Sequence, residues 1–162
     1  MKSTQYLSQK IFEKPDLKKE IMRQRLKGKT VVFTNGVFDL LHQGHLSSLY
    51  EAAAQGEFLI VAVNSDASVK RLKGSERPIQ DQQTRALVLA NLMVVDAVVI
   101  FETDTPKELI IELMPDVLVK GGDYLIEQIA GAHEVLAAGG KVVLAQMVDG
   151  FSTTRTIDKL KS

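Results

Sequence analysis

The sequence predicts an α/β fold, a Rossmann-like, doubly wound parallel sheet of about five strands with helices on both faces. Short runs of Val, Ile and Leu are almost continuously apolar, which is typical of strands covered on both sides. These runs alternate with longer stretches of helical pattern, as in successive β-α-β units. The expected strands are 31–33, 58–63, 96–101, 117–120 and 141–145, and the expected helices are 46–54, 81–92, 106–114 and 131–138.

Residues 1–29, ahead of the first strand, are expected to form an N-terminal helical extension. Within it, 16–26 is a mixed-charge, helix-compatible segment, and Leu17, Ile21 and Leu26 are expected to face the core. No residue in this extension suggests a chemical role.

Strand runs and helical stretches follow one another along the chain. The first strand, 31–33, leads into helix 46–54, which Gly56 closes, and Gly139-Gly140 ends the last helix before strand 141–145. The chain of 162 residues shows no internal repeat, low-complexity segment or linker, so we expect a single domain over 1–162.

The composition narrows the classes of partner. Twenty basic and twenty acidic residues give a net charge of zero, so no overall field favours nucleic acid or a membrane surface, and we expect neither as a partner. The absence of cysteine excludes disulfides, a thiolate nucleophile and a cysteine-based metal site. No apolar run is long enough for a signal or a membrane span, so we expect a cytoplasmic protein.

The stretch between the first strand and its helix carries the strongest chemical signal. A glycine-bearing turn that leads into a helix start gathers free N–H groups and a partial positive charge, which attract anions. His42 and His45 lie about one turn apart there, and Gly44 between them lets a phosphate approach the backbone. A helix cap or an ordinary surface histidine is the alternative, but the two features together favour a phosphate site. The preceding residues are Thr34, Asn35, Gly36, Val37, Phe38 and Asp39.

Loops at the carboxyl ends of parallel strands build the ligand crevice, which adds the segments 64–77, 120–124 and 146–154. The first has four basic residues within eight positions, and we interpret it as a loop because it contains Gly74 and is followed by Pro78. Lys73 is the residue expected to reach a polyphosphate. Weaker candidates are Arg77 and, on the following helix, Arg85, which could equally be a structural ion-pair partner; the whole run could also be a solvated charged face.

The other two segments pair glycines or hydroxyls with charge. Lys120 ends a strand and is followed by Gly121, Gly122, Asp123 and Tyr124, an arrangement that allows close approach of a ligand or forms a simple turn. In Asp149-Gly150-Phe151-Ser152-Thr153-Thr154, Ser152 or a threonine could cap a final helix, and the same hydroxyl and N–H groups suit a phosphate.

These motifs resemble a known superfamily. His42-Gln43-Gly44-His45 after Gly36-Val37-Phe38-Asp39 resembles the HxGH signature of the nucleotidyltransferases, which have a cytidylyltransferase-like fold. Further matches along residues 30–160 resemble the adenylyltransferases that make ADP-heptose, a lipopolysaccharide precursor. Chief among them are 115–124, which ends in Val-Lys-Gly-Gly-Asp-Tyr, and Asp-Gly-Phe-Ser-Thr-Thr at 149–154. That domain is often fused to a sugar kinase, for which this chain has no room, so the resemblance is to the standalone form.

The resemblance implies that ATP and D-glycero-β-D-manno-heptose 1-phosphate give ADP-heptose and pyrophosphate, with Mg²⁺ accompanying ATP and no dedicated protein ligands for the metal. It implies that His42 and His45 hold the α- and β-phosphates and that Lys73 neutralises the leaving pyrophosphate. The implied nucleotide contacts are Thr34, Asn35, Gly36, Val37, Phe38, Gly44, Lys120, Gly121, Asp123, Ser152, Thr153 and Thr154. Further substrate or phosphate contacts are Asp39, for which we favour a structural role over help with Mg²⁺, and Asn64, Asp66, Arg77 and Arg85.

Alternative functions remain open on the sequence alone. Glycerol-3-phosphate-type cytidylyltransferases carry an arginine-threonine pair where this chain has Met147 and Val148, which favours the adenylyltransferase interpretation. A catalytically silent nucleotide-binding regulator is disfavoured by the intact set of motifs. Finally, the apolar run 91–95 predicts a homodimer, since related cytidylyltransferases pair through this region, with core packing as the alternative.

Overall fold

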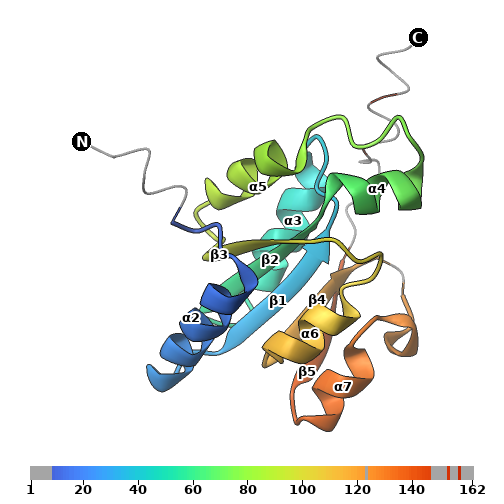
Figure 1. The fold of residues 1–162 in the computed structure, drawn as a ribbon. Coiled ribbons are helices and arrows are strands. Elements are labelled where there is room, and N and C mark those ends of the chain that lie inside the picture. Colours follow the sequence, from blue (N-terminus) through green and yellow to red (C-terminus); the bar gives the residue numbers. More distant parts are fainter. Residues whose placement is uncertain (1–8, 123, 147–152, 154–156, 158–162) are drawn as a thin grey trace.

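The computed structural model describes residues 9–122, 124–146, 153 and 157. It contains one five-stranded sheet in the order β3-β2-β1-β4-β5, and every neighbouring pair is parallel (Figure 1). The predicted α/β class with a doubly wound parallel sheet is confirmed. The strands are β1 Val31–Gly36, β2 Phe58–Asn64, β3 Ala97–Phe101, β4 Val117–Gly121 and β5 Lys141–Ala145.

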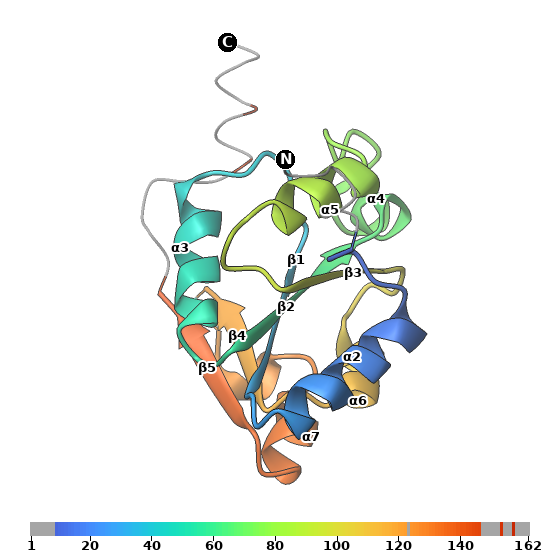
Figure 2. The same ribbon diagram turned by 90° about the vertical axis from the view of Figure 1, so that its left-hand side faces the viewer.

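Helices cover both faces of this sheet, with α3 on one side and α2, α6 and α7 on the other (Figure 2). Each face has its own apolar cluster, and α5 packs into the same cluster as α3. Because both faces are covered, β2 is buried along its whole length, which explains its uninterrupted apolar sequence. The helices are α2 Lys14–Leu26, α3 Gln43–Ala53, α4 Asp66–Lys73, α5 Gln82–Ala90, α6 Lys107–Leu113 and α7 Ala132–Ala137, with a 3₁₀ turn η1 at Ile126–Gln128.

The interpretation of 64–77 as a loop is wrong over most of its length, because Asp66–Lys73 forms α4. Ser65 caps this helix, its hydroxyl accepting a hydrogen bond from the Ser68 N–H, and Val69 is fully buried. Because the buried side of this helix is narrow and its exposed side is basic, the sequence showed no clear helical periodicity. Gly74 then ends the helix with a φ of 95°, so only the stretch after Lys73 is irregular.

The N-terminal helix follows the prediction with one correction. Leu17 and Ile21 are buried as expected, but Leu26 is 89% exposed and Gln24 is buried in its place. At about 100° per residue, a side chain five positions after Ile21 has turned about 140° away from the buried side. Among the described residues, no helix is long and apolar enough to cross a membrane.

Candidate active site

The turn between β1 and α3 has an unusual backbone. Phe38 and Leu40 have φ angles of 52° and 49°, in the left-handed region that residues other than glycine seldom adopt. His42 then occupies the N-cap position of α3, with His45 in the first turn of the helix. Backbone conformations of this kind persist where the surroundings determine them, and they concentrate at functional sites.

The side chain of Asp39 fixes this turn. It is 1% exposed, and its carboxylate accepts hydrogen bonds from the N–H groups of Ile79 and Gln80 at 2.8 and 3.0 Å. It also forms an ion pair with Arg77, whose Nη2 lies 3.0 Å from Oδ2. Its backbone carbonyl accepts a hydrogen bond from the Thr153 hydroxyl at 2.8 Å. Asp39 therefore joins the turn to two distant segments of the chain.

Arg85, which is 0% exposed, forms a second set of buried hydrogen bonds to this turn. Its guanidinium donates to the carbonyl oxygens of Val37 at 2.7 Å and Gln80 at 2.9 Å, and to Asp66 Oδ1 at 2.7 Å. The side chain of Asn64, also buried, donates to the Ser68 hydroxyl. Of the two roles that the sequence allows for Arg85, these contacts are those of a structural ion-pair partner beneath the site.

The two histidines of the motif stack on each other. The ring centroids of His42 and His45 are 3.8 Å apart with planes inclined by 20°, and Phe38 and His45 form an edge-to-face pair with centroids 5.5 Å apart. Burial, reinforced by the positive charges of His42 and Lys73, lowers the pKa of His45 to about 4, and burial also lowers the pKa of His42. His45 is therefore neutral at pH 7, where it can donate a hydrogen bond without carrying charge.

Two lysines from different elements lie at this edge of the sheet, Lys73 near His45 and Lys120 near Lys73. Lys73 is the last residue of α4, and its pKa is lowered by burial and by the positive charge of Arg77. Lys120, near the end of β4, has a pKa lowered by burial and by the positive charge of Lys73, and its ammonium lies 5.6 Å from the centroid of the Tyr124 ring. The mutual repulsion of these groups would be relieved by a polyanion placed between them.

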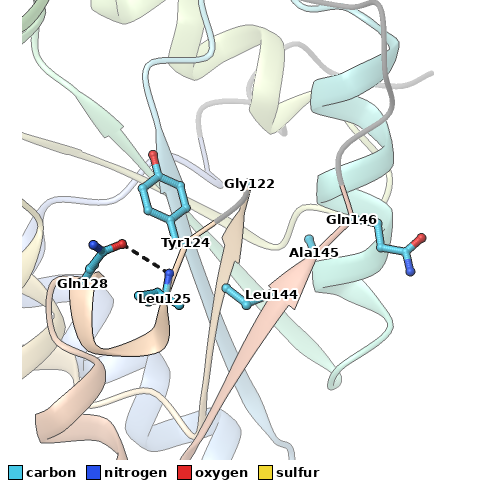
Figure 3. Close-up of a pocket in the computed structure, with 7 residues that line it drawn as sticks. All are labelled: Gly122, Tyr124, Leu125, Gln128, Leu144, Ala145 and Gln146. Atoms are coloured by element: carbon cyan, nitrogen blue, oxygen red, sulfur yellow. Dashed lines mark hydrogen bonds between the residues drawn. The ribbon is translucent and has the colours of Figure 1, made fainter.

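A cavity of about 420 Å³ opens at the carboxyl ends of β4 and β5 (Figure 3). Leu125 from the following loop and Leu144 from β5 provide apolar walls, and Gln128 provides a side-chain amide, whereas the side chain of Gln146 points away from the other lining residues. The strand register places Leu144 beside Lys120, so the cavity adjoins the cluster of basic groups. The lining is completed by Gly122, Tyr124 and Ala145.

The glycines of the site allow close approach between elements. A Cβ at Gly121 would lie 2.9 Å from the Ser48 hydroxyl, so β4 and α3 meet closely at this point. The remaining predicted contacts on this edge, Thr34, Asn35 and Gly36, end β1, and Gly44 lies in the first turn of α3. Asp123, Ser152 and Thr154 lie outside the described residues, as do Met147 and Val148.

Several residues of the site had no sequence signal. Gln80, whose side chain accepts from the Leu40 N–H at 3.2 Å, is one of three glutamines in a polar stretch and nothing in the sequence singles it out. Leu125, Gln128 and Leu144 line the cavity without forming a motif. For these three cavity residues, the one available indication was their position after or near the end of a predicted strand.

Comparison with known proteins identifies the family, since residues 33–157 match the model described as cytidylyltransferase-like. The chain belongs to the cytidylyltransferase-like family. It is therefore a nucleotidyltransferase, and the family resemblance found in the motifs is confirmed.

Curated relatives of this cytidylyltransferase-like chain are longer proteins. It is 51% identical over 152 residues to the bifunctional protein HldE of Yersinia enterocolitica, covering 94% of the chain and 32% of the relative. It is 53% identical over 151 residues to HldE of Cronobacter sakazakii, covering 93% and 32%. The chain thus spans about a third of the length of these relatives.

Two solved structures share the fold. The lipopolysaccharide core biosynthesis protein of Thermoplasma volcanium is 31% identical with a TM-score of 0.63, and the match covers 75% of this chain and all of that one. The pantoate-beta-alanine ligase of Francisella tularensis, in complex with beta-gamma ATP and beta-alanine, has a TM-score of 0.62. Its match covers 91% of this chain and 72% of the ligase at 14% identity, which shows the common fold alone.

Proposed function

We propose that this chain transfers AMP from ATP to D-glycero-β-D-manno-heptose 1-phosphate and releases ADP-heptose and pyrophosphate. The observation that carries the proposal is the convergence of the stacked His42 and His45 with Lys73 and Lys120 at one edge of the sheet. The sugar is supported by the motifs shared with ADP-heptose-forming enzymes and by the identity of 51–53% to HldE proteins. A lipopolysaccharide core biosynthesis protein among the solved structures agrees with this substrate class.

In the proposed reaction a phosphate oxygen of the sugar 1-phosphate attacks the α-phosphorus of ATP in line. A new oxygen–phosphorus bond forms as the bond to the β-phosphate bridging oxygen breaks, and pyrophosphate leaves with that electron pair. No protein nucleophile is needed, so catalysis consists of positioning and charge stabilisation. His42 and His45 donate hydrogen bonds to the α- and β-phosphates, and Lys73 neutralises the departing pyrophosphate.

The proposed Mg²⁺ would be carried by the nucleotide phosphates. Magnesium keeps several waters and usually takes only one or two protein carboxylates in phosphate sites. Among the described residues, no group of three His, Asp or Glu side chains lies close enough to hold a metal ion. Asp39 in particular already accepts hydrogen bonds from two backbone N–H groups and pairs with Arg77. When bound, the ion would offset the negative charge on the transferring phosphate.

The other site residues complete the proposal. Lys120, with Gly121 and Asp123 after it, and Thr153, with Ser152 and Thr154 beside it, would contact the nucleotide. We propose that the reaction takes place in the cytoplasm, without nucleic acid or membrane partners. The direct test is pyrophosphate release from ATP and a panel of sugar 1-phosphates. A bound but unreacted nucleotide across the whole panel would favour a silent regulator instead.

The enzyme is expected to use ATP and to use CTP much more poorly. The triphosphate and the helix start fix one end of either nucleotide, so base choice depends on a few contacts around the base. At position 147 the chain has methionine where cytidylyl relatives have arginine, so that donor for cytosine is missing, and methionine is a residue type that packs well against the apolar face of a larger base. Turnover of heptose 1-phosphate with each nucleotide at matched Mg²⁺ measures the preference, and equal or better efficiency with CTP would establish the cytidylyltransferase alternative.

We also expect a homodimer that pairs through the end of α5 and the segment after it. Met93 is 89% exposed, and Leu87 and Val88 on α5 are 44% and 37% exposed, whereas Val95 is fully buried in the core. The segment thus presents apolar side chains outward as well as inward, which suits pairing of two copies. Light scattering at micromolar concentration is expected to give twice the chain mass, and Met93→Lys should shift it toward the monomer. A monomeric parent would refute the pairing.

A further inference from the structure

Among the described residues, no group forms the hydrogen bond to Nδ1 that would usually fix a functional imidazole such as His45. In many such sites the second ring nitrogen takes part in a hydrogen bond of its own, which sets the tautomer and the orientation of the ring. Here Nδ1 of His45 is buried and has no hydrogen-bond partner within the described part of the chain. The ring contacts remain: His42 stacks on one face, and the edge of Phe38 lies at 61° to the His45 plane.

The Phe38 ring is itself held firmly. The residue is 8% exposed, and its left-handed backbone directs the side chain back toward the end of β1. There it lies against Gly36, where a Cβ would come within 3.0 and 3.1 Å of two ring carbons. A side chain at position 36 would therefore push the ring out of place, so glycine at the end of the strand and phenylalanine in the turn fit as a pair.

We propose that Phe38 is a positioning residue that holds the imidazole of His45 in the orientation in which it meets the transferring phosphate. The inference rests on the proposed function for the identity of that phosphate and goes beyond it, since the family resemblance gives Phe38 only as a nucleotide contact. Aromatic pairs with this edge-to-face geometry are favourable beyond their buried area. Together with the His42 stack, the contact orients the ring in place of a hydrogen bond at Nδ1, for which the described residues supply no partner.

Phe38→Leu tests the proposal because leucine keeps an apolar side chain but has no ring edge. We expect kcat to fall by about tenfold to a hundredfold, as for other small displacements of a catalytic group. KM for ATP should stay within about threefold of the parent, because the contact proposed to matter is the one to His45. A higher KM with unchanged kcat would instead indicate the nucleotide contact that the family resemblance implies and would contradict the positioning role. The titration midpoint of His45, measured by NMR and assigned with His42→Gln and His133→Gln, should rise from about 4 toward 6.5 as the ring becomes less buried.

Phe58→Leu is the matched control. Phe58 is a 5% exposed phenylalanine at the start of β2, at the opposite edge of the sheet from the site. It should lose stability to a similar degree while leaving kcat and the His45 titration unchanged.

Gly36→Ala should disturb the same contact by displacing the Phe38 ring, without removing any side chain. It replaces Phe38→Leu as the test if that variant does not fold. It should lower kcat and raise the His45 midpoint in the same directions, and it should have little further effect in a Phe38→Leu background, because the ring it displaces is already gone. An effect of Gly36→Ala that persists in that background, or a Phe38→Leu variant that keeps both kcat and the His45 midpoint, would overturn the proposal. The titration needs no substrate, so a parent without pyrophosphate release would refute the proposed function, and the His45 midpoints would still decide the positioning role.

Discussion

His45→Ala is expected to fold normally and to release pyrophosphate about a hundred to a thousand times more slowly than the parent. The imidazole lies in the first turn of α3, in contact with the Phe38 and His42 rings, and is neutral at pH 7. It can therefore donate a hydrogen bond to charge that develops on the transferring phosphate, and loss of one such donor typically has this cost. Circular dichroism and steady-state pyrophosphate release measure fold and rate.

The matched control is His133→Ala. His133 lies on α7 with an exposed side chain, far along the chain from the motif, and its removal should leave the rate unchanged. A well-folded His45→Ala enzyme within about tenfold of the parent would show that this ring does not stabilise the transferring phosphate.

Asp39→Ala is expected to lower the free energy of unfolding by about 3–5 kcal/mol. The substitution removes a buried carboxylate and leaves Arg77, whose side chain is 12% exposed, without its ion-pair partner. The N–H groups of Ile79 and Gln80 lose their acceptor at the same time. Urea denaturation followed by circular dichroism gives the change.

Two further variants test whether the buried ion pair causes this loss of stability. Adding Arg77→Met to Asp39→Ala removes the unpaired charge, so the double variant should recover part of the lost stability. Arg25→Met breaks an ion pair with Asp116 at the surface and should cost no more than about 1 kcal/mol. An Asp39→Ala variant as mildly affected as Arg25→Met would show that the turn is held by other contacts.

The sequence was sufficient to predict the sheet because its strands are buried on both faces. In a chain of this size, a short apolar run such as 58–63 is typical of a buried strand, and the predicted runs mapped closely onto the observed strands. Helix α4 was missed for the opposite reason. Its buried side consists of little more than Ser68 and Val69, and its exposed side is basic, so local periodicity gave no clear signal.

In the site, too, the sequence indicated local contacts but not contacts between residues far apart in the chain. The stacking of His42 and His45 follows from a spacing of three residues at a helix start, which is a local property. The ties that hold the turn are not local: Asp39 binds N–H groups 40 and 41 positions away, and Arg85 reaches a carbonyl 48 positions back. No motif marks such pairs, since they arise only when the carboxyl ends of separate strands meet.

The buried carboxylate of Asp39 has a consequence for how such an enzyme can change over generations. This carboxylate binds Arg77 and the backbone N–H groups of Ile79 and Gln80 together. The effect of a substitution at one of these positions on stability therefore depends on which residues occupy the others. Variants of this turn should therefore survive mainly as matched sets. The side chains around the cavity at the end of β5, such as Leu144, take no part in that network and can be exchanged singly. Under the proposed function, new preferences for base or sugar would arise at this cavity, while phosphate binding by the turn would stay the same.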